Sequence, residues 1–378
     1  MLDIRDVAEA FPPGEILKDE LEARGWTQDV LAEITNIPAP VISNIINGKR
    51  AISVDIASSL AAAFGTTAQF WMNLETSYQL WMETKADAKI SRKARLYASV
   101  PVNELVKRGW IEASKDIDIL EDRILHFLDR ESLDEPSRLV YATKKATEKA
   151  TPAQVAWVHR AKQLASCIRK VEKFSRESFA IALKKLKELR KNAEDIREVA
   201  RILADGGVRL ILIEGLPKGK IDGATFWLDE HSPVVVLSIR YDRLDYFWFA
   251  LMHELGHVAN RDALENLPIL DVNLVGDDTT PFEDKSEVEK RADQFAEGFL
   301  VEKAEIETFI RRYSPLYSKQ KIKNFSARIG VHPAIVLGQL QYRKEVNWTH
   351  SREMLVKVRD IAIAGTLTDG WGHQPPAM

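Results

Sequence analysis

The sequence predicts a mainly α-helical chain with one small α+β domain in its C-terminal half. Two observations predict the helices. Short amphipathic segments separated by glycine and proline fill the first eighty residues, and residues 153–205 contain neither proline nor glycine. A third observation predicts the sheet: after Gly206 and Gly207 the pattern changes to short β-branched runs, which are typical of strands.

The length and the cysteine content limit what the chain can be. Its 378 residues exceed what one hydrophobic core usually organises, so two or three domains are expected. No stretch approaches the roughly twenty apolar residues that cross a bilayer, and the first residues lack a secretory layout, which favours a cytoplasmic protein without membrane contact. Cys167 is the only cysteine, so any metal site must use histidine and carboxylate ligands.

Charge is distributed unevenly along the chain, although the net charge is only −3. Residues 1–82 carry 5 Lys+Arg against 11 Asp+Glu, whereas residues 144–201 carry 16 against 7. The basic run 184–191 suggests nucleic-acid binding. However, Leu186 and Leu189 interleave with its charges at helical spacing, which favours the solvated outer face of a packed helix.

A helix-turn-helix is predicted within the first eighty residues. Thr27 can cap a helix that runs to about Ile34. A second short helix extends from Pro38 to about Asn47 and stops at Gly48. The second helix of such a motif enters the DNA major groove and meets the base edges. The residues expected at the DNA are Gln28, Ala39, Pro40, Ser43, Asn44, Lys49 and Arg50. The first and the last two of them are placed for phosphate contacts, which position a domain without specifying a sequence.

Three segments of the region 1–84, namely 13–21, 43–53 and 64–74, resemble the HigA-type antitoxin branch of the Xre-like DNA-binding domains. The resemblance implies a repressor that binds a palindromic operator as a homodimer, with a toxin as a candidate partner. The negative charge of this region and the apolar turn 38–40 are not what DNA binding favours. The alternative is therefore a helix-turn-helix that serves only as a protein-interaction module.

An apolar segment, residues 247–257, ends in the motif His253-Glu254-Leu255-Gly256-His257 and favours a buried helix. On a helix, His253 and His257 share one face, so both imidazoles can bind one metal ion with Glu254 beside them. This is the arrangement of a zinc hydrolase in which Glu254 is the catalytic base. The alternative is a structural helix with two hydrogen-bonded histidines.

A catalytic zinc site needs a third protein ligand, which we expect on the predicted helix 283–300. At about 100° per residue, Glu289 lies about 60° from Ala292, the centre of the apolar stripe on this helix. Two other glutamates of the segment, Glu287 and Glu297, lie about 140° from that centre. Glu289 is therefore the predicted ligand. Asp293 borders the same face and is expected to accept the second ring N–H of a zinc-bound histidine.

The region around the motif is predicted to form a zincin-like domain. Three strands are expected at 208–214, 224–229 and 233–239, and such a fold offers an edge strand to which an extended peptide can add. The expected organisation is a helix-turn-helix domain in 1–84, a helical connector in 85–204, the zincin-like domain in 205–345 and a C-terminal tail in 346–378.

Residues 205–345 resemble the ImmA/IrrE metallopeptidase family through the segments 245–257, 289–296 and 331–341. The resemblance implies a Zn²⁺ cofactor, water activation with Glu254 as the base, and a DNA-binding repressor as the protein substrate. His332 is the candidate for stabilising the oxyanion, with a capping or core role as the alternative. One departure from the family pattern, Arg291 in place of a common glutamate, is expected at the periphery.

These features predict a DNA-binding regulator, similar to an antitoxin, with a zinc endopeptidase domain that cleaves or senses a regulatory protein. One alternative is a DNA-binding repressor whose zinc domain is a non-hydrolytic sensor or a structural module. Another is a peptidase that is recruited by a protein partner through the helix-turn-helix, without DNA. The presence of Glu254 favours the enzyme.

Overall fold

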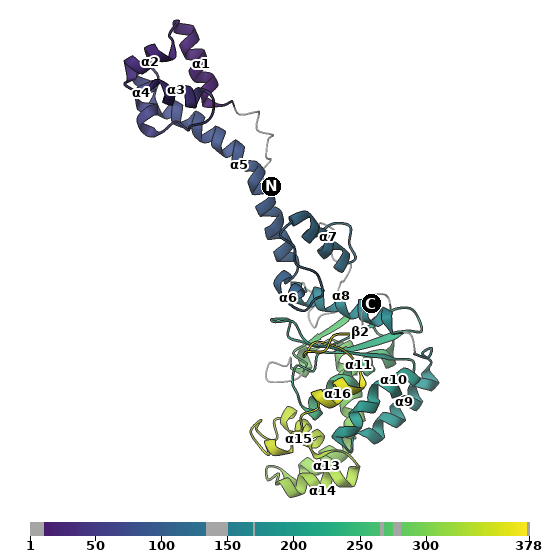
Figure 1. Ribbon diagram of the computed structural model, residues 1–378. Helices are drawn as coiled ribbons and strands as arrows, with labels where there is room; N and C mark the ends of the chain where they lie inside the picture. Colours follow the sequence, from purple (N-terminus) through teal and green to yellow (C-terminus); the bar gives the residue numbers. More distant parts are fainter. Residues whose placement is uncertain (1–10, 134–149, 169–170, 265–267, 275–280, 376–378) are drawn as a thin grey trace. The chain divides into compact units, whose positions relative to one another are not determined.

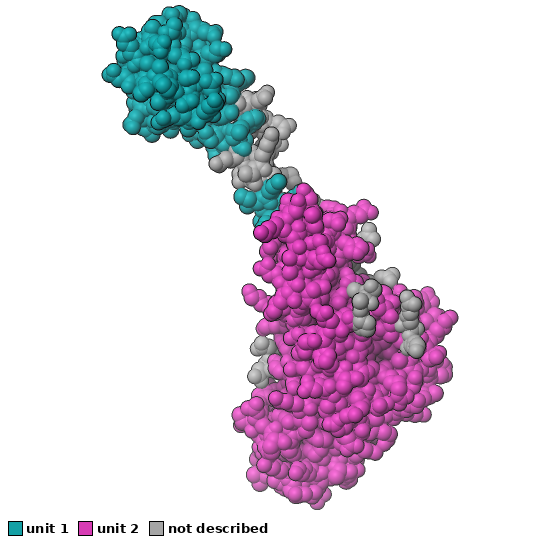
Figure 2. Space-filling view, viewed as in Figure 1, with its two compact units in different colours: residues 1–95 teal, residues 96–378 magenta. Residues whose placement is uncertain are grey.

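The structure is a computed structural model that describes residues 11–133, 150–168, 171–264, 268–274 and 281–375. The chain is 61% helical, and its fold class is mainly α with a small α+β domain, as the sequence predicts. It divides into two compact units, Met1–Arg95 and Leu96–Met378, which Figure 2 colours separately. Within the described ranges, no helix combines the length and the apolar character that a membrane span requires.

In the first unit, the described residues 11–95 form helices and no strands. Its helices are α1 (Pro13–Arg24), α2 (Gln28–Thr35), α3 (Ala39–Ile46), α4 (Val54–Phe64) and the long α5 (Ala68–Ser99), whose last residues belong to the second unit. The Thr27 hydroxyl accepts a hydrogen bond from Val30 N at 3.3 Å and so caps α2. Asn36 ends α2 in the left-handed conformation, with φ of 56°, and turns the chain toward α3. Helices α2 and α3 form the predicted helix-turn-helix around a core that includes the fully buried Leu31 and Trp71.

The second unit is built on a five-stranded mixed sheet with the order β4-β2-β3-β1-β5. Figure 1 shows α8 (Pro152–Cys167) on one side of this sheet and α11 (Leu244–Asn260) on the other. The strands are β1 (Arg209–Ile213), β2 (Ile221–Trp227), β3 (Pro233–Leu237), β4 (Ile269–Val272) and β5 (Leu367–Asp369). β1 runs parallel to β3 and β5, whereas β2 runs antiparallel to β3 and β4. The three predicted strands are present, with β2 starting earlier than expected. The two edge strands, β4 and β5, are not among the predicted strands, because four and three residues are too few to show an alternating pattern.

Helices cover both faces of this sheet. Along β1, Leu210 and Leu212 belong to one hydrophobic core and Ile211 and Ile213 to the other, the alternation that every strand imposes. The first core joins the sheet to α9 (Arg176–Leu189), α10 (Val199–Asp205), α11 (Leu244–Asn260), α12 (Glu287–Leu300), α13 (Lys303–Tyr313), α14 (Lys319–Ile329), α15 (Pro333–Tyr342) and α16 (Arg359–Gly365). The second core joins it to α6 (Val102–Lys107), α7 (Ile117–Phe127) and α8 (Pro152–Cys167). Short 3₁₀ helices lie at Ala193–Glu198, Phe282–Asp284 and Arg352–Met354.

Most of the segment expected to be a connector packs directly on the sheet, and so does the segment expected to be a tail. Trp157 of α8 is fully buried, and its indole N–H donates to Ile213 O at 3.2 Å. Arg160 of α8 makes a buried ion pair of 2.6 Å with Asp369 of β5. The physical reason is that β1, β2 and β3 are buried along almost their whole length, so both faces of the sheet need a cover of helices.

Candidate metal centre

Helix α11 carries the two histidines and the glutamate of the predicted metal motif. His253, Glu254 and His257 are fully buried. The helix sets the two imidazoles one turn apart, with 4.9 Å between the ring centroids and 3.2 Å between the two Nε2 atoms. The Nε2 atoms of both rings therefore face the same small space.

An aspartate holds each imidazole through its other ring nitrogen. Asp293 Oδ1 lies 2.9 Å from His253 Nδ1, and Asp262 Oδ2 lies 3.0 Å from His257 Nδ1. Asp293 also accepts a hydrogen bond from the buried ammonium of Lys285. These contacts favour a proton on each Nδ1 and leave each Nε2 with a lone pair for a ligand. Asp293 is the aspartate predicted for this role, whereas Asp262 is an addition to the prediction. The signal for it is an acid five residues after His257, within reach of the same helix end.

Two acidic side chains from other elements complete the cluster. On α12, Glu289 Oε2 lies 3.4 Å from His253 Nε2, and Oε1 lies 3.8 Å from His257 Nε2. On β4, Asp271 Oδ2 lies 3.3 Å from His253 Nε2 and 3.6 Å from His257 Nε2. One potential ligand atom from each of the four residues lies within 4.8 Å of those of the other three. Asp271 is absent from the ligand set that the sequence predicted.

The atoms of this cluster fit a bound metal cation. Both Asp271 oxygens and Glu289 Oε2 are buried and have no hydrogen-bond partner in the described part of the chain. Buried carboxylate oxygens normally have partners, so these atoms point to a cation that interacts with them and with the two Nε2 lone pairs. Two imidazoles and two carboxylates are a donor set that four-coordinate zinc accepts.

The electrostatics of the cluster favour positive charge at its centre. Burial lowers the pKa of His257, but Asp262 and Asp271 outweigh burial and raise this pKa to about 9. Burial also opposes ionisation of Asp271, yet the two histidines hold the pKa of its carboxyl well below the usual value. The carboxylates therefore stabilise a cation between them, either a proton on a histidine or a metal ion.

Strand β2 positions Glu254. The Thr225 hydroxyl donates a 2.6 Å hydrogen bond to Glu254 Oε2, whereas Oε1 has no partner among the described residues. Burial and the charge of Asp271 raise the pKa of Glu254 well above its usual value. A Cβ atom at Gly223 would lie 2.9 Å from Glu254 Cδ and closer still to Oε1. The strand can approach this carboxylate only because residue 223 has no side chain.

A second glycine brings the two ligand-bearing helices together. A Cβ atom at Gly256 of α11 would lie 3.0 Å from the Cα of Ala292 on α12. The close approach lets Glu289 and Asp293 of α12 reach the face of α11 that carries the histidines. The glycine within the motif therefore serves helix packing.

His332 and Arg291 both lie outside the metal cluster. His332 caps α15, since its Nδ1 accepts a 3.1 Å hydrogen bond from Ala334 N. This contact does not involve the metal cluster, and it corresponds to the capping alternative. Arg291 Nη2 lies 3.4 Å from Asp262 Oδ1, so the residue that departs from the family pattern contacts the hydrogen-bond partner of His257. The Arg291 side chain is 55% exposed and lies outside the metal cluster, which agrees with the expected peripheral position.

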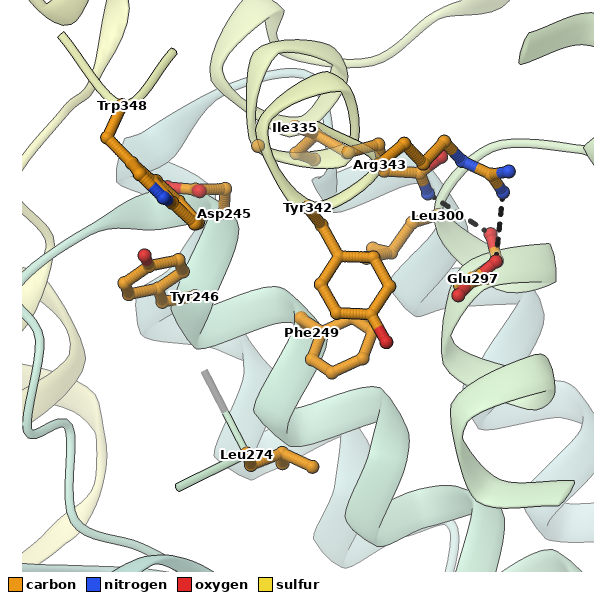
Figure 3. A pocket seen from close by; sticks show the side chains of 12 residues that line it. Asp245, Tyr246, Phe249, Leu274, Glu297, Leu300, Ile335, Tyr342, Arg343 and Trp348 are labelled. Atoms are coloured by element: carbon orange, nitrogen blue, oxygen red, sulfur yellow. Dashed lines mark hydrogen bonds and ion pairs between the residues drawn. The ribbon is translucent and has the colours of Figure 1, made fainter. Parts of the chain in front are cut away.

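Figure 3 shows a small apolar pocket that has Phe249, one helical turn before His253, in its wall. The ring centroid of Phe249 lies 6.3 Å from that of His253 and 6.1 Å from that of Tyr342. Figure 3 shows the Arg343–Glu297 ion pair, with an N–O distance of 2.9 Å, at one side of the pocket. The other lining residues include Tyr246, Leu274, Leu300, Ile335 and Trp348.

The residues expected at DNA lie on α2, on α3 and just after α3. Four of them are exposed, namely Pro40, Asn44, Lys49 and Arg50, and three are half-buried, namely Gln28, Ala39 and Ser43. The backbone N–H groups of Lys49 and Arg50 both donate to Asn44 O, at 2.8 and 3.2 Å. The two basic residues are thereby held at the C-terminal end of α3.

Comparison with known families gives two matches in separate parts of the chain. Residues 17–71 match the helix-turn-helix family, and residues 209–340 match the family described as the IrrE N-terminal-like domain. The first match contains α2 and α3, and the second contains all four residues of the metal cluster.

Individual relatives resemble the N-terminal part of the chain. Antitoxin HigA-1 of Vibrio cholerae is 42% identical over 69 residues, which are 18% of this chain and 65% of that protein. Virulence-associated protein I of Dichelobacter nodosus is 38% identical over 74 residues, which are 19% of this chain and 68% of that protein. A solved HigA-family addiction module antidote protein from Coxiella burnetii is 38% identical, covers 23% of this chain and 95% of its own, and has a TM-score of 0.22. The structure of Pseudomonas aeruginosa antitoxin HigA with the higBA promoter is 39% identical, covers 21% of this chain and 89% of its own, and has a TM-score of 0.21.

Proposed function

Because the chain belongs to the helix-turn-helix family through residues 17–71 and carries an IrrE N-terminal-like domain in residues 209–340, we propose that it is a DNA-binding regulator with a zinc-dependent endopeptidase domain. The observation that carries the peptidase proposal is the convergence of His253, His257 and Glu289 beside the buried carboxylate of Glu254. A metal-holding set next to a carboxylate with one free oxygen is what metal-assisted hydrolysis requires.

In the proposed peptide hydrolysis, each residue of the site would have a separate role. His253, His257 and Glu289 hold Zn²⁺, and Asp293 and Asp262 fix the orientation of the two rings. When bound, zinc supplies Lewis-acid polarisation of a peptide carbonyl and acidifies water. Thr225 fixes Oε2 of Glu254, so the unpaired Oε1 is left to take a proton from the attacking water and return it to the leaving amine.

The proposed substrate is a regulatory protein in an extended conformation. Strand β4 lies at the edge of the sheet beside α11, where a peptide can add as a further strand. The apolar pocket around Phe249 and Tyr342 suits an apolar side chain of such a peptide, because its walls are mainly aromatic and aliphatic (Figure 3).

The proposed DNA contacts lie on α3 and just after it. The exposed Asn44 can reach base edges, and Lys49 and Arg50 can contact phosphates. We further propose binding to a palindromic operator as a homodimer, in the cytoplasm, with a toxin as a second candidate partner. The similarity to HigA antitoxins supports this part of the proposal.

A second candidate function is a DNA-binding repressor whose zinc domain senses a signal without hydrolysis. The observation that favours it is the complete burial of His253, His257 and Glu254, since a peptide must reach the ion to be cut. A third candidate, recruitment by a protein partner without DNA, is favoured by the negative charge of residues 1–82.

The decisive experiment uses the purified full-length protein. Bound zinc is measured, and the protein is incubated with candidate repressors in parallel with Glu254→Gln and with the control Glu287→Gln, which changes an exposed glutamate of α12. The wild type and the control should cleave one of the repressors, and Glu254→Gln should bind zinc but not cleave. Stoichiometric zinc without any cleavage supports the sensor function instead.

Gel shifts at several salt concentrations test the DNA-binding part. The affinity for an operator should fall steeply as salt rises, because phosphate contacts release counterions. The variant Lys49→Ala with Arg50→Ala should weaken binding to every sequence and reduce the salt dependence. An absence of any shift at low salt supports recruitment through protein contacts.

A further inference from the structure

Asp271 is the one member of the metal cluster that lies on the sheet. It belongs to the edge strand β4, where it stands opposite Gly223 of β2 in the antiparallel register. Its neighbour Leu270 belongs to the core on the other face of the sheet, so the side chain of Asp271 is directed to the face that carries α11. The absence of a side chain at Gly223 leaves this part of the face to Glu254 and Asp271.

The surroundings of Asp271 are those of a ligand and not of an ordinary buried acid. The side chain is 1% exposed, and neither of its oxygens has a hydrogen-bond partner in the described part of the chain. Oδ2 lies 3.3 Å from His253 Nε2 and 3.6 Å from His257 Nε2, which are the two nitrogens that face the metal space. An isolated buried carboxylate is costly, so a charged partner is required.

Protons on the histidines do not meet this requirement as well as a metal ion does. The Nδ1 atoms are engaged by Asp293 and Asp262, so further protons would have to lie on the two Nε2 atoms, which are 3.2 Å apart. A single proton can be shared between the two nitrogens, but it balances the charge of only one of the two carboxylates, Asp271 and Glu289. A second proton at that distance would repel the first. One divalent cation interacts favourably with both nitrogens and with both acids at the same time.

We propose that Asp271 is a fourth protein ligand that closes the coordination shell of the metal in the resting protein. The inference rests on the metal site of the proposed function and adds a latent state to it. With His253, His257, Glu289 and Asp271 all bound, a tetrahedral zinc ion has no open position, and the site has the closed ligand shell of a structural zinc site. Hydrolysis then requires Asp271 to leave the metal, for which its place on an edge strand is suited, because β4 is paired to the sheet on one side only in the described residues.

The test measures access to the metal and not activity. The full-length protein is loaded with Co²⁺, and its visible absorption is recorded while azide is added to the wild type, to Asp271→Ala, to Asp271→Asn and to a control, Asp360→Ala, which changes an exposed residue of α16. The spectra of the wild type and the control should stay unchanged by azide. Asp271→Ala should show a saturable change, because azide enters the position that the carboxylate has left.

Zinc affinity provides a second measurement. Asp271→Ala should bind zinc at least roughly tenfold more weakly than the wild type in competition with a chelator, since even residues that only orient ligands affect affinity by about 10–100-fold. Asp271→Asn, which keeps one carbonyl oxygen, should lie between the two. An unchanged zinc affinity in Asp271→Ala contradicts the proposal.

The wild type alone is sufficient to overturn the inference, even if Asp271→Ala does not fold. An azide-dependent spectrum of the wild-type Co²⁺ protein shows an open position, which overturns closure by Asp271 and leaves the zinc peptidase intact. A wild-type protein that binds neither Co²⁺ nor Zn²⁺ overturns the metal site itself, and the closure with it.

Discussion

Gly223 is a single residue that determines where the Glu254 carboxylate lies. Because Gly223 has no side chain, the carboxylate occupies the space that a Cβ atom would fill. The aspartates act at the same scale. Asp293 and Asp262 each engage one Nδ1 atom, and this leaves the two Nε2 atoms free to face the metal space. Arg291 contacts Asp262 in turn, so the carboxylate of Asp262 lies between the exposed guanidinium of Arg291 and His257 of α11.

Gly223→Ala should displace Glu254 while leaving the metal-binding residues in place. The added Cβ would lie 2.9 Å from Glu254 Cδ, so the carboxylate has to move, at an expected cost of about 1–3 kcal/mol in unfolding free energy. Peptide cleavage should fall strongly, and zinc content should stay near that of the wild type. Chemical denaturation, zinc analysis and a cleavage assay check these expectations.

The matched control is Gly298→Ala. Gly298 lies in the last turn of α12. No heavy atom lies within 4 Å of a Cβ atom added at this position. This change should stabilise the protein by about 0.5–1 kcal/mol, because alanine favours a helix over glycine. Equal cleavage by the two glycine variants would show that the position of Glu254 does not matter.

His159 of α8 should make the unfolding free energy of the second unit depend on pH. Burial, followed by Lys162 and Arg130, lowers the pKa of His159 to about 4, so the folded protein keeps this imidazole neutral. The unfolded chain takes up the proton at its usual pKa of about 6.5. The stability that the neutral form contributes is complete above pH 6.5 and is lost as the pH falls toward 4, by up to roughly 3 kcal/mol.

Urea unfolding at pH 7.5 and at pH 4.5 measures this loss. His159→Gln cannot be protonated in this range, so its stability should decline less than that of the wild type between the two values. The same decline in both proteins would assign the acid sensitivity to other groups.

Elements far apart in sequence are joined through a few buried contacts, and α8 with β5 is the clearest case. Arg160 and Asp369 are separated by 209 residues and form a 2.6 Å ion pair with side chains 9% and 4% exposed. The pair holds the last strand against β1 and under α8. The ion pair therefore explains how β5, which has few apolar residues, forms an edge strand of the sheet.

Asp369→Ala should destabilise the second unit by about 3–5 kcal/mol, because it leaves the buried Arg160 without its partner. Guanidinium unfolding followed by tryptophan fluorescence measures the effect. Asp205→Ala is the control: its partners Lys185 and Arg201 are largely exposed, so the change should stay below about 1 kcal/mol.

The double replacement Arg160→Met with Asp369→Leu gives the reciprocal test. It removes both charges, so it should be less destabilising than Asp369→Ala alone. If the double variant loses as much unfolding free energy as Arg160→Met and Asp369→Leu lose together, the ion pair is not the source of the effect.

At the scale of the whole molecule, the helix-turn-helix and the metal cluster lie in different compact units. One unit contains α1 to α4, and the other contains all four residues of the cluster. The proposed regulator therefore couples two sites that have different cores. Coupling by proteolysis needs no rigid path between the units, since a cut changes which parts remain covalently attached.

Zinc should stabilise the second unit and leave the first unchanged. At a free concentration of about 100 times its Kd, an ion that binds only the folded state stabilises it by about 2.7 kcal/mol. Hydrogen exchange of the full chain, with zinc and with a chelator, should show the difference in peptides from β2, β4, α11 and α12. An equal response in α1 to α4 would contradict the thermodynamic independence of the units.

Local features of the sequence were sufficient to predict the helix-turn-helix, the two helices that carry the metal cluster, three strands and the geometry around His253 and His257. Helical periodicity places two histidines on one face and turns Glu289 and Asp293 toward the same side, and these relations need only neighbouring residues. The capping residue Thr27 belongs to the same class, because a helix cap is decided by residues that are close in sequence.

Only the tertiary structure decided which distant segments meet. Asp271 joins the cluster because β4 pairs with β2 in a register that sets it opposite Gly223, and neither strand is long enough to reveal that register from its own pattern. The connector and the tail are parts of the sheet unit for a similar reason: an apolar face shows that it must be covered, but not which helix covers it. Sequence periodicity records the direction of a side chain relative to its own element, whereas a site made from several elements depends on contacts that the whole core selects.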